Sequence, residues 1–442
     1  MLKSLKLQNV GPAPSMELEL GERLNLLTGD NGLGKSFLLD VMWWALTRKW
    51  PQDVNEWMTS GYPARPRDPK QQASIECSLQ GKSGSIVSPS SIFDRVNQYW
   101  PNKVGRPPSP GLVLYAHADG SFSIWDPARN YWKHGGDSDL PQKVPAYVLT
   151  PTEVWDELET EVDGKEIIVC SGLIADWKSW ILEGGKAAKM MQAVLSKLAP
   201  PGETLEPGKL VKVFLQEDRQ YPTLRTAHGV EVPVIHASSG VRRILALAYM
   251  LVWAWNAHVD ATELQGEEPT NQVILLVDEA EAHLHPKWQR TILSSLLEVV
   301  NELRNDVKVQ VVAATHSPLV MASAEPLFDP ECDAWFDLDL EEGNVLLRKR
   351  PFVRRGDVSN WLTSEAFDLE SALGKLDAEG AILEARKVLS QPSPTHAVIR
   401  KADESLRHAG LSDIDPFWAR WSFFVEQKLG INGTHHSQGE KR

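Results

Sequence analysis

The sequence has few cysteines, no long apolar run and no excess of positive charge. Its three cysteines, Cys77, Cys170 and Cys332, are far apart and form no C-x-x-C pair, which argues against a disulfide scaffold or a structural zinc site. No apolar run reaches the roughly 18 residues that a membrane span needs. The first ten residues alternate leucine with lysine and do not form a signal-peptide core. We therefore expect a cytoplasmic protein with no membrane contact.

The charge balance is acidic. The 442 residues include 46 Lys and Arg against 59 Asp and Glu, which gives a net charge of −13. Proteins that coat nucleic acid non-specifically depend on Lys and Arg to replace phosphate counterions, so any such contact here requires a local basic patch. With 42% hydrophobic and 24% charged residues, the composition is that of a globular protein with a packed core.

Short periodic segments predict an α/β fold. Continuous apolar runs with β-branched residues at 273–277 and 309–314 are typical of strands buried on both faces of a parallel sheet. A helical period over 286–303 separates them, so the order strand, helix, strand predicts a βαβ unit. Further helices are expected at 36–50, 153–198 and 241–257.

A glycine-rich run is the strongest motif. It reads Gly29-Asp30-Asn31-Gly32-Leu33-Gly34-Lys35-Ser36 and has the G-x-x-x-x-G-K-S pattern between an apolar strand and a helix. Glycines let backbone N–H groups close around phosphates, and the helix N-terminus adds positive potential. Lys35 would reach the β and γ phosphates of ATP, and the Ser36 hydroxyl would bind Mg²⁺. We expect this run, together with Phe37, to bind the nucleotide.

Two carboxylates follow the strand at 273–277. Asp278 would hold Mg²⁺ through its water shell, and Glu279 would orient or deprotonate the water that attacks the γ-phosphate. Acidic residues at the end of a strand are common, but together with the phosphate loop they predict an ATPase.

Further segments resemble a known family. The stretch from Asp278 to Gln289 is similar to the D-E-x-E-x-x-L-H-P-x-x-Q segment of ABC-type ATPases in the RecF, SMC and OLD-like group. Residues 237–243 resemble the degenerate ABC signature. Residues 314–318, at the end of a buried strand, resemble the switch-histidine segment around His316. The four motifs occur in the family's order, and the resemblance covers about residues 1–50 and 235–350.

The resemblance implies a P-loop NTPase with an ABC-type ATPase head, and a homodimer or higher homo-oligomer. The phosphate loop of one subunit and the signature of another would enclose each ATP. Ser238, Ser239 and Gly240 would bind the neighbour's γ-phosphate through a helix N-terminus; a simple helix cap is the other interpretation. His316 would sense the γ-phosphate.

The resemblance also implies a biological setting. Similar ATPase subunits in Septu, PARIS and retron-associated systems belong to bacterial anti-phage defence, where the ATPase controls a separate effector, a nuclease or toxin. The alternative is a RecF-like ATPase of DNA repair or chromosome maintenance that clamps DNA. The motor of a membrane transporter is a third class, which the long segment between Lys35 and Ser238 disfavours.

One family feature is missing. Where a Q-loop glutamine is expected, after a strand leading into the helical lobe, residues 146–153 contain no Gln. Either another group contacts Mg²⁺ and water there, or the loop lies elsewhere.

The domain organisation follows from these segments. We expect the first part of the head at 1–50, a β-rich insertion with a mobile loop (81–110) at 51–150, and a helical insertion at 151–235. The second part of the head follows at 236–350, and a C-terminal helical extension with a disordered tail from 431 follows at 351–442.

Four remaining features each have an ordinary structural explanation beside a functional one. The motif Asp337-Leu338-Asp339 is interpreted as a solvated hairpin strand, so a nuclease site is not expected. The His283 and His285 pair is assigned to the loop after Glu279 and not to a metal. The basic residues between Arg348 and Arg355 are either a phosphate contact or solvated charge. The aromatic helix near 417–424 is either core or a docking face.

Overall fold

The computed structural model describes residues 1–81, 84–101, 109–130, 144, 146–162, 165–226, 229–367, 369, 376–409 and 416–429. Part of the predicted loop at 81–110 and all of the predicted tail from 431 lie outside these residues. The chain divides into two compact units, Met1–Trp361 and Leu362–Arg442.

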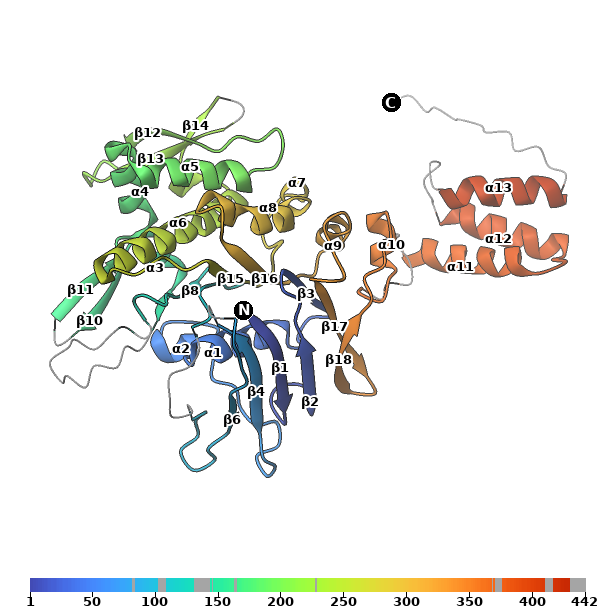
Figure 1. Ribbon diagram of the computed structural model, residues 1–442. Helices are drawn as coiled ribbons and strands as arrows, with labels where there is room; N and C mark the ends of the chain where they lie inside the picture. Colours follow the sequence, from blue (N-terminus) through green and yellow to red (C-terminus); the bar gives the residue numbers. More distant parts are fainter. Residues whose placement is uncertain are drawn as a thin grey trace. The chain divides into compact units, whose positions relative to one another are not determined.

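The largest sheet that the described residues of the first unit build has eight strands (Figure 1). Across the sheet they are β18 (Asn344–Arg350), β17 (Ala334–Glu341), β3 (Leu24–Gly29), β16 (Lys308–Ala314), β15 (Gln272–Val277), β7 (Leu112–Ala116), β8 (Phe122–Trp125) and β9 (Tyr147–Leu149). From β17 to β7 neighbouring strands are parallel, whereas β18, β8 and β9 pair antiparallel to their neighbours. The predicted α/β class with a parallel βαβ core is confirmed.

The strand order brings the predicted motifs to one edge. β16 lies between β3, which leads into the phosphate loop, and β15, which leads into Asp278. Because these three strands are parallel, their carboxyl ends meet at the same edge of the sheet. The phosphate loop, the carboxylates and the switch-histidine segment therefore emerge side by side.

A smaller antiparallel sheet lies on the other side of α1 (Lys35–Thr47), which contacts β1 of this sheet as well as β3, β15 and β16 of the large one (Figure 1). The strands of the smaller sheet are β2 (Ser15–Glu19), β1 (Leu2–Gln8), β4 (Ser74–Gln80), β5 (Ile86–Val87) and β6 (Ser90–Ile92). Because α1 is covered on both sides, it is apolar nearly all round, and Trp43 and Trp44 are fully buried. The described strands of the β-rich stretch 51–150, which also holds α2 (Pro51–Val54), are divided between the two sheets.

The predicted helical region 151–235 also contains strands. A hairpin of β10 (Leu158–Val162) and β11 (Lys165–Cys170) interrupts the helix predicted over 153–198, which was wrong at this point. Thr160 and Val162 alternate with glutamate in β10, and Ile167, Ile168 and Val169 follow one another in β11; such β-branched residues favour strands. The remaining elements are α3 (Pro151–Trp155), α4 (Gly172–Glu183), α5 (Lys186–Leu198), β12 (Glu206–Lys212), β13 (Gln220–Arg225), β14 (Glu231–Pro233) and η1 (Val234–His236).

Helix α6 (Ser239–Gln265) is the one helix of the described residues long and apolar enough to cross a membrane, but 72% of its apolar window is buried inside the unit. Its apolar side chains are accounted for by core packing. The helix predicted over 286–303 is broken near Thr291 into shorter pieces. They are α7 (Pro286–Gln289), α8 (Ile292–Glu298) and η2 (Val299–Glu302), and α9 (Pro318–Ala324) and α10 (Val358–Leu362) follow later.

The second unit contains α11 (Leu376–Ser390), α12 (His396–His408) and α13 (Pro416–Leu429). Its core includes Ile399, Leu406 and Trp421, and the Trp421 side chain is fully buried. The indole Nε1 of Trp421 donates to Asp403 Oδ1 at 3.0 Å. At least this part of the aromatic helix near 417–424 is core.

Candidate functional site

The phosphate loop joins β3 to α1 and needs glycine at its first position. Gly29 has φ 127°, in the region that favours glycine, and a Cβ there would lie 2.3 Å from the backbone oxygen of Leu338 on β17. The loop therefore lies tightly against the neighbouring strand. The first N–H groups of α1 lack intrahelical partners, as at every helix start, so they are available to an anion.

Lys35 folds back over this loop. Its Nζ donates to the backbone oxygens of Gly29 at 2.7 Å and Asp30 at 2.8 Å, and the side chain is buried. Burial lowers the pKa of Lys35, and the carboxylates of Asp278 and Asp30 partly offset this. The ammonium group is thus held among acidic side chains at the carboxyl edge of the sheet.

Asp278 and Ser36 are brought together as predicted. Asp278 follows β15 directly and is buried, and the Ser36 side chain at the start of α1 is near enough to affect its titration. Burial raises the pKa of Asp278, and the Ser36 hydroxyl and Arg243 oppose the rise. A hydroxyl and a carboxylate oxygen are ligands that Mg²⁺ prefers, so the donor set fits that ion.

Glu279 turns the chain away from the sheet. Its φ of 46° is left-handed, which is uncommon for a residue with a side chain and marks a locally constrained backbone. The next residue is still held to the sheet, because Ala280 N donates to Ala314 O at 3.1 Å. Glu279 therefore lies at the turn where β15 gives way to the following loop.

Glu281 was not predicted as a site residue, although it belongs to the acidic motif that begins at Asp278. Its Oε2 accepts from Thr315 Oγ1 at 2.6 Å and its Oε1 accepts from His316 N at 2.5 Å. Burial is the main cause that lowers the pKa of His316, Lys35 adds to it, and Glu281 opposes it. The loop after β15 therefore holds the switch-histidine segment directly.

Gln289 makes a second link between the same two segments. Its Oε1 accepts from Ser317 Oγ at 2.8 Å, and its Nε2 donates to Leu284 O at 2.9 Å. His285 nearby is exposed and caps α7 through its Nδ1.

The signature-like segment forms the start of α6. Ser238 is the N-cap, and its Oγ accepts from Val241 N at 3.4 Å, as a simple cap would. Ser239 is exposed. A Cβ on Gly240 would lie 2.5 Å from the backbone oxygen of His283, so the helix start packs closely on the loop after Glu279.

Arg243 was also missed, and only its position in space reveals it. From α6 it donates to Asp278 O at 2.8 Å and to Ala118 O at 2.9 Å. Burial lowers the pKa of Arg243, and Asp278 and Glu279 oppose this. Helix α6, which begins with the signature-like segment, is thus joined to the backbone of Asp278.

The segment in which a Q-loop glutamine was expected lies at the edge of the large sheet. Residues 146–153 form the edge strand β9 and the start of α3, whereas β7 is the strand that flanks β15. β7 is followed by His117, whose Nε2 shares a hydrogen bond with Ser123 Oγ at 2.8 Å and whose ring stacks on Tyr115. Burial lowers the pKa of His117 to about 3.

The Asp337-Leu338-Asp339 motif is not a solvated strand, which corrects the sequence interpretation. Asp337 is buried in β17 because this hairpin belongs to the large sheet, and it accepts from Thr28 Oγ1 at 2.6 Å. Arg350 forms ion pairs with both aspartates, and Arg348 pairs with Asp339 and with an acidic residue at the end of β17. Two arginines of the predicted basic patch are therefore neutralised by the neighbouring strand.

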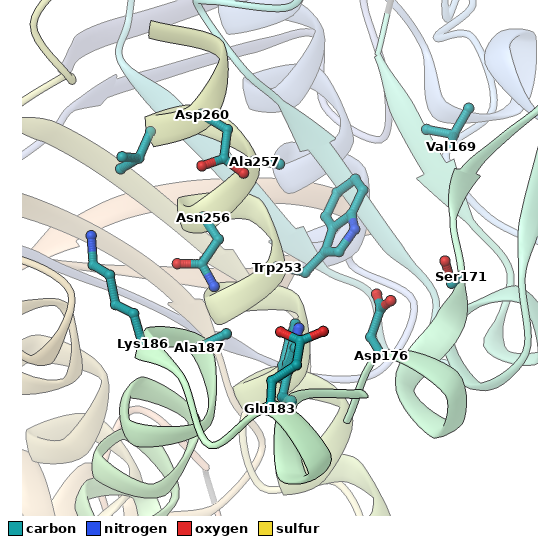
Figure 2. A pocket seen from close by; sticks show the side chains of 12 residues that line it. Val169, Ser171, Asp176, Glu183, Lys186, Ala187, Trp253, Asn256, Ala257 and Asp260 are labelled. Carbon is teal, nitrogen blue, oxygen red and sulfur yellow. The ribbon is translucent and has the colours of Figure 1, made fainter. Parts of the chain in front are cut away.

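A separate cavity lies among α4, α5, α6 and β11, with a volume of about 450 Å³ (Figure 2). Asp176, Glu183, Asp260, Lys186 and Trp253 are among its lining side chains. None of the predicted site residues lines it, so it is distinct from the site at the carboxyl edge of the sheet.

Comparisons with known proteins found similar ATPases. Residues 158–321 match the family described as "AAA ATPase domain", and residues 4–102 match the one described as "AAA domain". The Septu protein PtuA of Bacillus thuringiensis is 21% identical over 85% of this chain and 84% of that protein. The retron Vc95 probable ATPase of Vibrio cholerae serotype O1 biovar El Tor is 31% identical over 26% of this chain and 22% of that protein. These similarities support an ABC-like ATPase.

Among solved structures, the SMC head domain from Thermotoga maritima is similar with a TM-score of 0.36 and 12% identity, over 79% of this chain and 99% of that one. The matched AAA domains support ATPase activity. They extend over β1 to β6 and from β10 into α9, so they include both the phosphate loop and the carboxylates.

Proposed function

We propose that this chain binds ATP with Mg²⁺, hydrolyses it between two head-to-tail copies, and thereby controls a separate effector protein in bacterial anti-phage defence. The observation that carries the ATPase part is the buried Asp278, which lies near both Ser36 and Lys35 of the phosphate loop. The defence setting rests on the similarity to PtuA and the retron ATPase.

Each residue has a role in this scheme. Ser36 and Asp278 would hold Mg²⁺, which neutralises phosphate charge when bound. Lys35 would exchange its two backbone partners for phosphate oxygens. Glu279 would orient the attacking water and take its proton, and His316 would contact the γ-phosphate.

The surface at the start of α6 supports the head-to-tail arrangement. Ser239 is exposed in the first turn of a 27-residue helix, where N–H groups and a hydroxyl suit a phosphate. In such a dimer, each active site takes its phosphate loop from one copy and its Ser239 from the other.

Two inactive variants should therefore complement each other. Lys35→Ala disables the phosphate loop, and Ser239→Arg blocks the signature surface while leaving the Ser238 cap in place. In an equal mixture half of the dimers contain one intact site, so about a quarter of the wild-type ATPase rate should return if the sites are independent. A mixture as inactive as its components would contradict the shared site.

The effector is sought with Glu279→Gln, which should slow hydrolysis while ATP still binds. The tagged variant is expressed from its own locus, and its native mass is measured with and without ATP. We expect ATP to shift the mass to a dimer or higher multiple that carries a second polypeptide. Recovery of DNA in place of a protein, lost steeply as salt is added, would favour the RecF-like DNA clamp. A mass that does not respond to ATP, with nothing bound, would contradict effector control.

A further inference from the structure

The backbone of His316 is held by a side chain and not by the sheet. Thr315 N still donates to Leu27 O of β3 at 3.0 Å. One residue later the N–H of His316 donates instead to Glu281 Oε1 at 2.5 Å, and the Thr315 hydroxyl donates to the other oxygen of the same carboxylate at 2.6 Å. The Glu281 carboxylate thus accepts the backbone N–H of the first residue beyond the hydrogen bonds between β16 and β3.

The two hydrogen bonds to the Glu281 carboxylate hold the segment more firmly than the neutral hydrogen bonds of an ordinary turn. Hydrogen bonds to an ionised acceptor are shorter and roughly twice as strong as neutral ones. Glu281 lies two residues after Glu279, in the loop whose first residue past Glu279 is bonded to Ala314 O at 3.1 Å. The position of His316 is therefore tied to the turn that carries Glu279.

We propose that Glu281 is a positioning residue, which fixes the backbone of His316 so that its imidazole and the Glu279 carboxylate address the same γ-phosphate. Gln289 supports the same segment through Ser317. The inference rests on the proposed function, because it assumes that this chain hydrolyses ATP with His316 at the γ-phosphate.

A positioning role differs measurably from a general role in stability. If Glu281 acts through His316, the two residues form one unit, and their substitutions are not additive in kcat. If Glu281 merely stabilises the fold, its loss lowers the activity of the His316→Ala variant as well, together with thermal stability.

The test measures kcat and the Kd for ATP of the full-length chain with substitutions at Glu281 and His316. We expect Glu281→Ala to lower kcat by about a hundredfold, the cost of a small misplacement at a reacting centre, with little change in Kd. Glu281→Gln should recover much of kcat, because its amide oxygen accepts from His316 N while the Thr315 hydroxyl accepts from the amide N–H. The double variant Glu281→Ala with His316→Ala should be no slower than His316→Ala.

The control is Glu263→Ala, which changes an exposed glutamate near the end of α6 and should leave kcat at the wild-type value. Should Glu281→Ala fail to fold, Thr315→Val, which removes one of the two bonds, must still lower kcat. Additive losses in the double variant, or wild-type kcat in Glu281→Ala or in Thr315→Val, would overturn the inference.

Failure of the inference can be told apart from failure of the proposed function. If wild-type protein does not hydrolyse ATP, or if His316→Ala is as fast as wild type, the proposed mechanism is wrong. If His316→Ala is slow and Glu281→Ala is normal, only the role of Glu281 is wrong.

Discussion

Asp40 provides a test of the electrostatics behind the phosphate loop. It lies on α1, one turn after Ser36, and its Oδ1 accepts from the Tyr115 hydroxyl of β7 at 3.0 Å. Burial raises the pKa of Asp40 from an ordinary 3.8 to about 7, and the charge of Asp278 adds to the rise, while the Tyr115 bond opposes it.

A raised pKa means that the folded state holds the proton more tightly than the unfolded state. The stability contributed by protonated Asp40 is fully present below the ordinary pKa and is lost as the pH rises through about 7. The interval between the two pKa values corresponds to at most about 4 kcal/mol, less whatever water screens at this partly exposed residue.

Asp40→Asn should therefore stabilise the protein increasingly as the pH rises, because asparagine stays neutral. The free energy of unfolding, measured by urea denaturation without nucleotide or Mg²⁺, should favour the variant by about 2 to 3 kcal/mol more at pH 8 than at pH 5. Tyr115→Phe removes the bond that favours the carboxylate and so should raise the pKa of Asp40 further. The free energy of unfolding should then keep falling up to a higher pH. If the free energies of unfolding of Asp40→Asn and wild type differ by the same amount at every pH between 5 and 8, the reasoning is refuted.

Two further substitutions test the phosphate loop and the second unit. Gly29→Ala should abolish ATP binding measured by calorimetry, because its Cβ would meet backbone at 2.3 Å. A Cβ on Gly32 meets nothing within 4 Å, and only its φ of 79° strains the backbone, so Gly32→Ala should weaken binding less. Trp421→Ala removes a fully buried indole and should cost about 3 to 5 kcal/mol, so hydrogen exchange in α11 to α13 should rise sharply while residues 1–361 stay protected. Phe423→Ala, at a side chain 69% exposed, should leave that exchange unchanged.

The sequence was most informative where chemistry depends on neighbours along the chain. The glycine spacing of the phosphate loop, the apolar run before Asp278 and the apolar strand before His316 are local patterns, and each predicted its element. The hairpin over 158–170 was missed because a short amphipathic stretch between two helices satisfies a helical period and a strand period equally well.

The errors in the candidate site have a different origin. Asp337 appeared solvated because a D-x-D hairpin alternates polar and apolar residues, yet its strand pairs with β3 and is covered. Burial of that carboxylate depends on Thr28 and Arg350, which are 309 and 13 residues away in the sequence. No sequence window contains both Thr28 and Asp337, so that pairing could be found only in space.

The same distinction explains what joins the parts of the site. Because β16 lies between β3 and β15, the phosphate loop and Asp278 follow strands that are not neighbours in the sheet, and the His316 segment follows the strand between them. Glu281 connects the loop after β15 to that segment, and Arg243 connects the backbone of Asp278 to α6. The motifs thus supply the groups that would contact ATP. Glu281 and Arg243 hold the segments that carry those groups together, and their hydrogen-bond partners lie at least 34 residues away in the sequence.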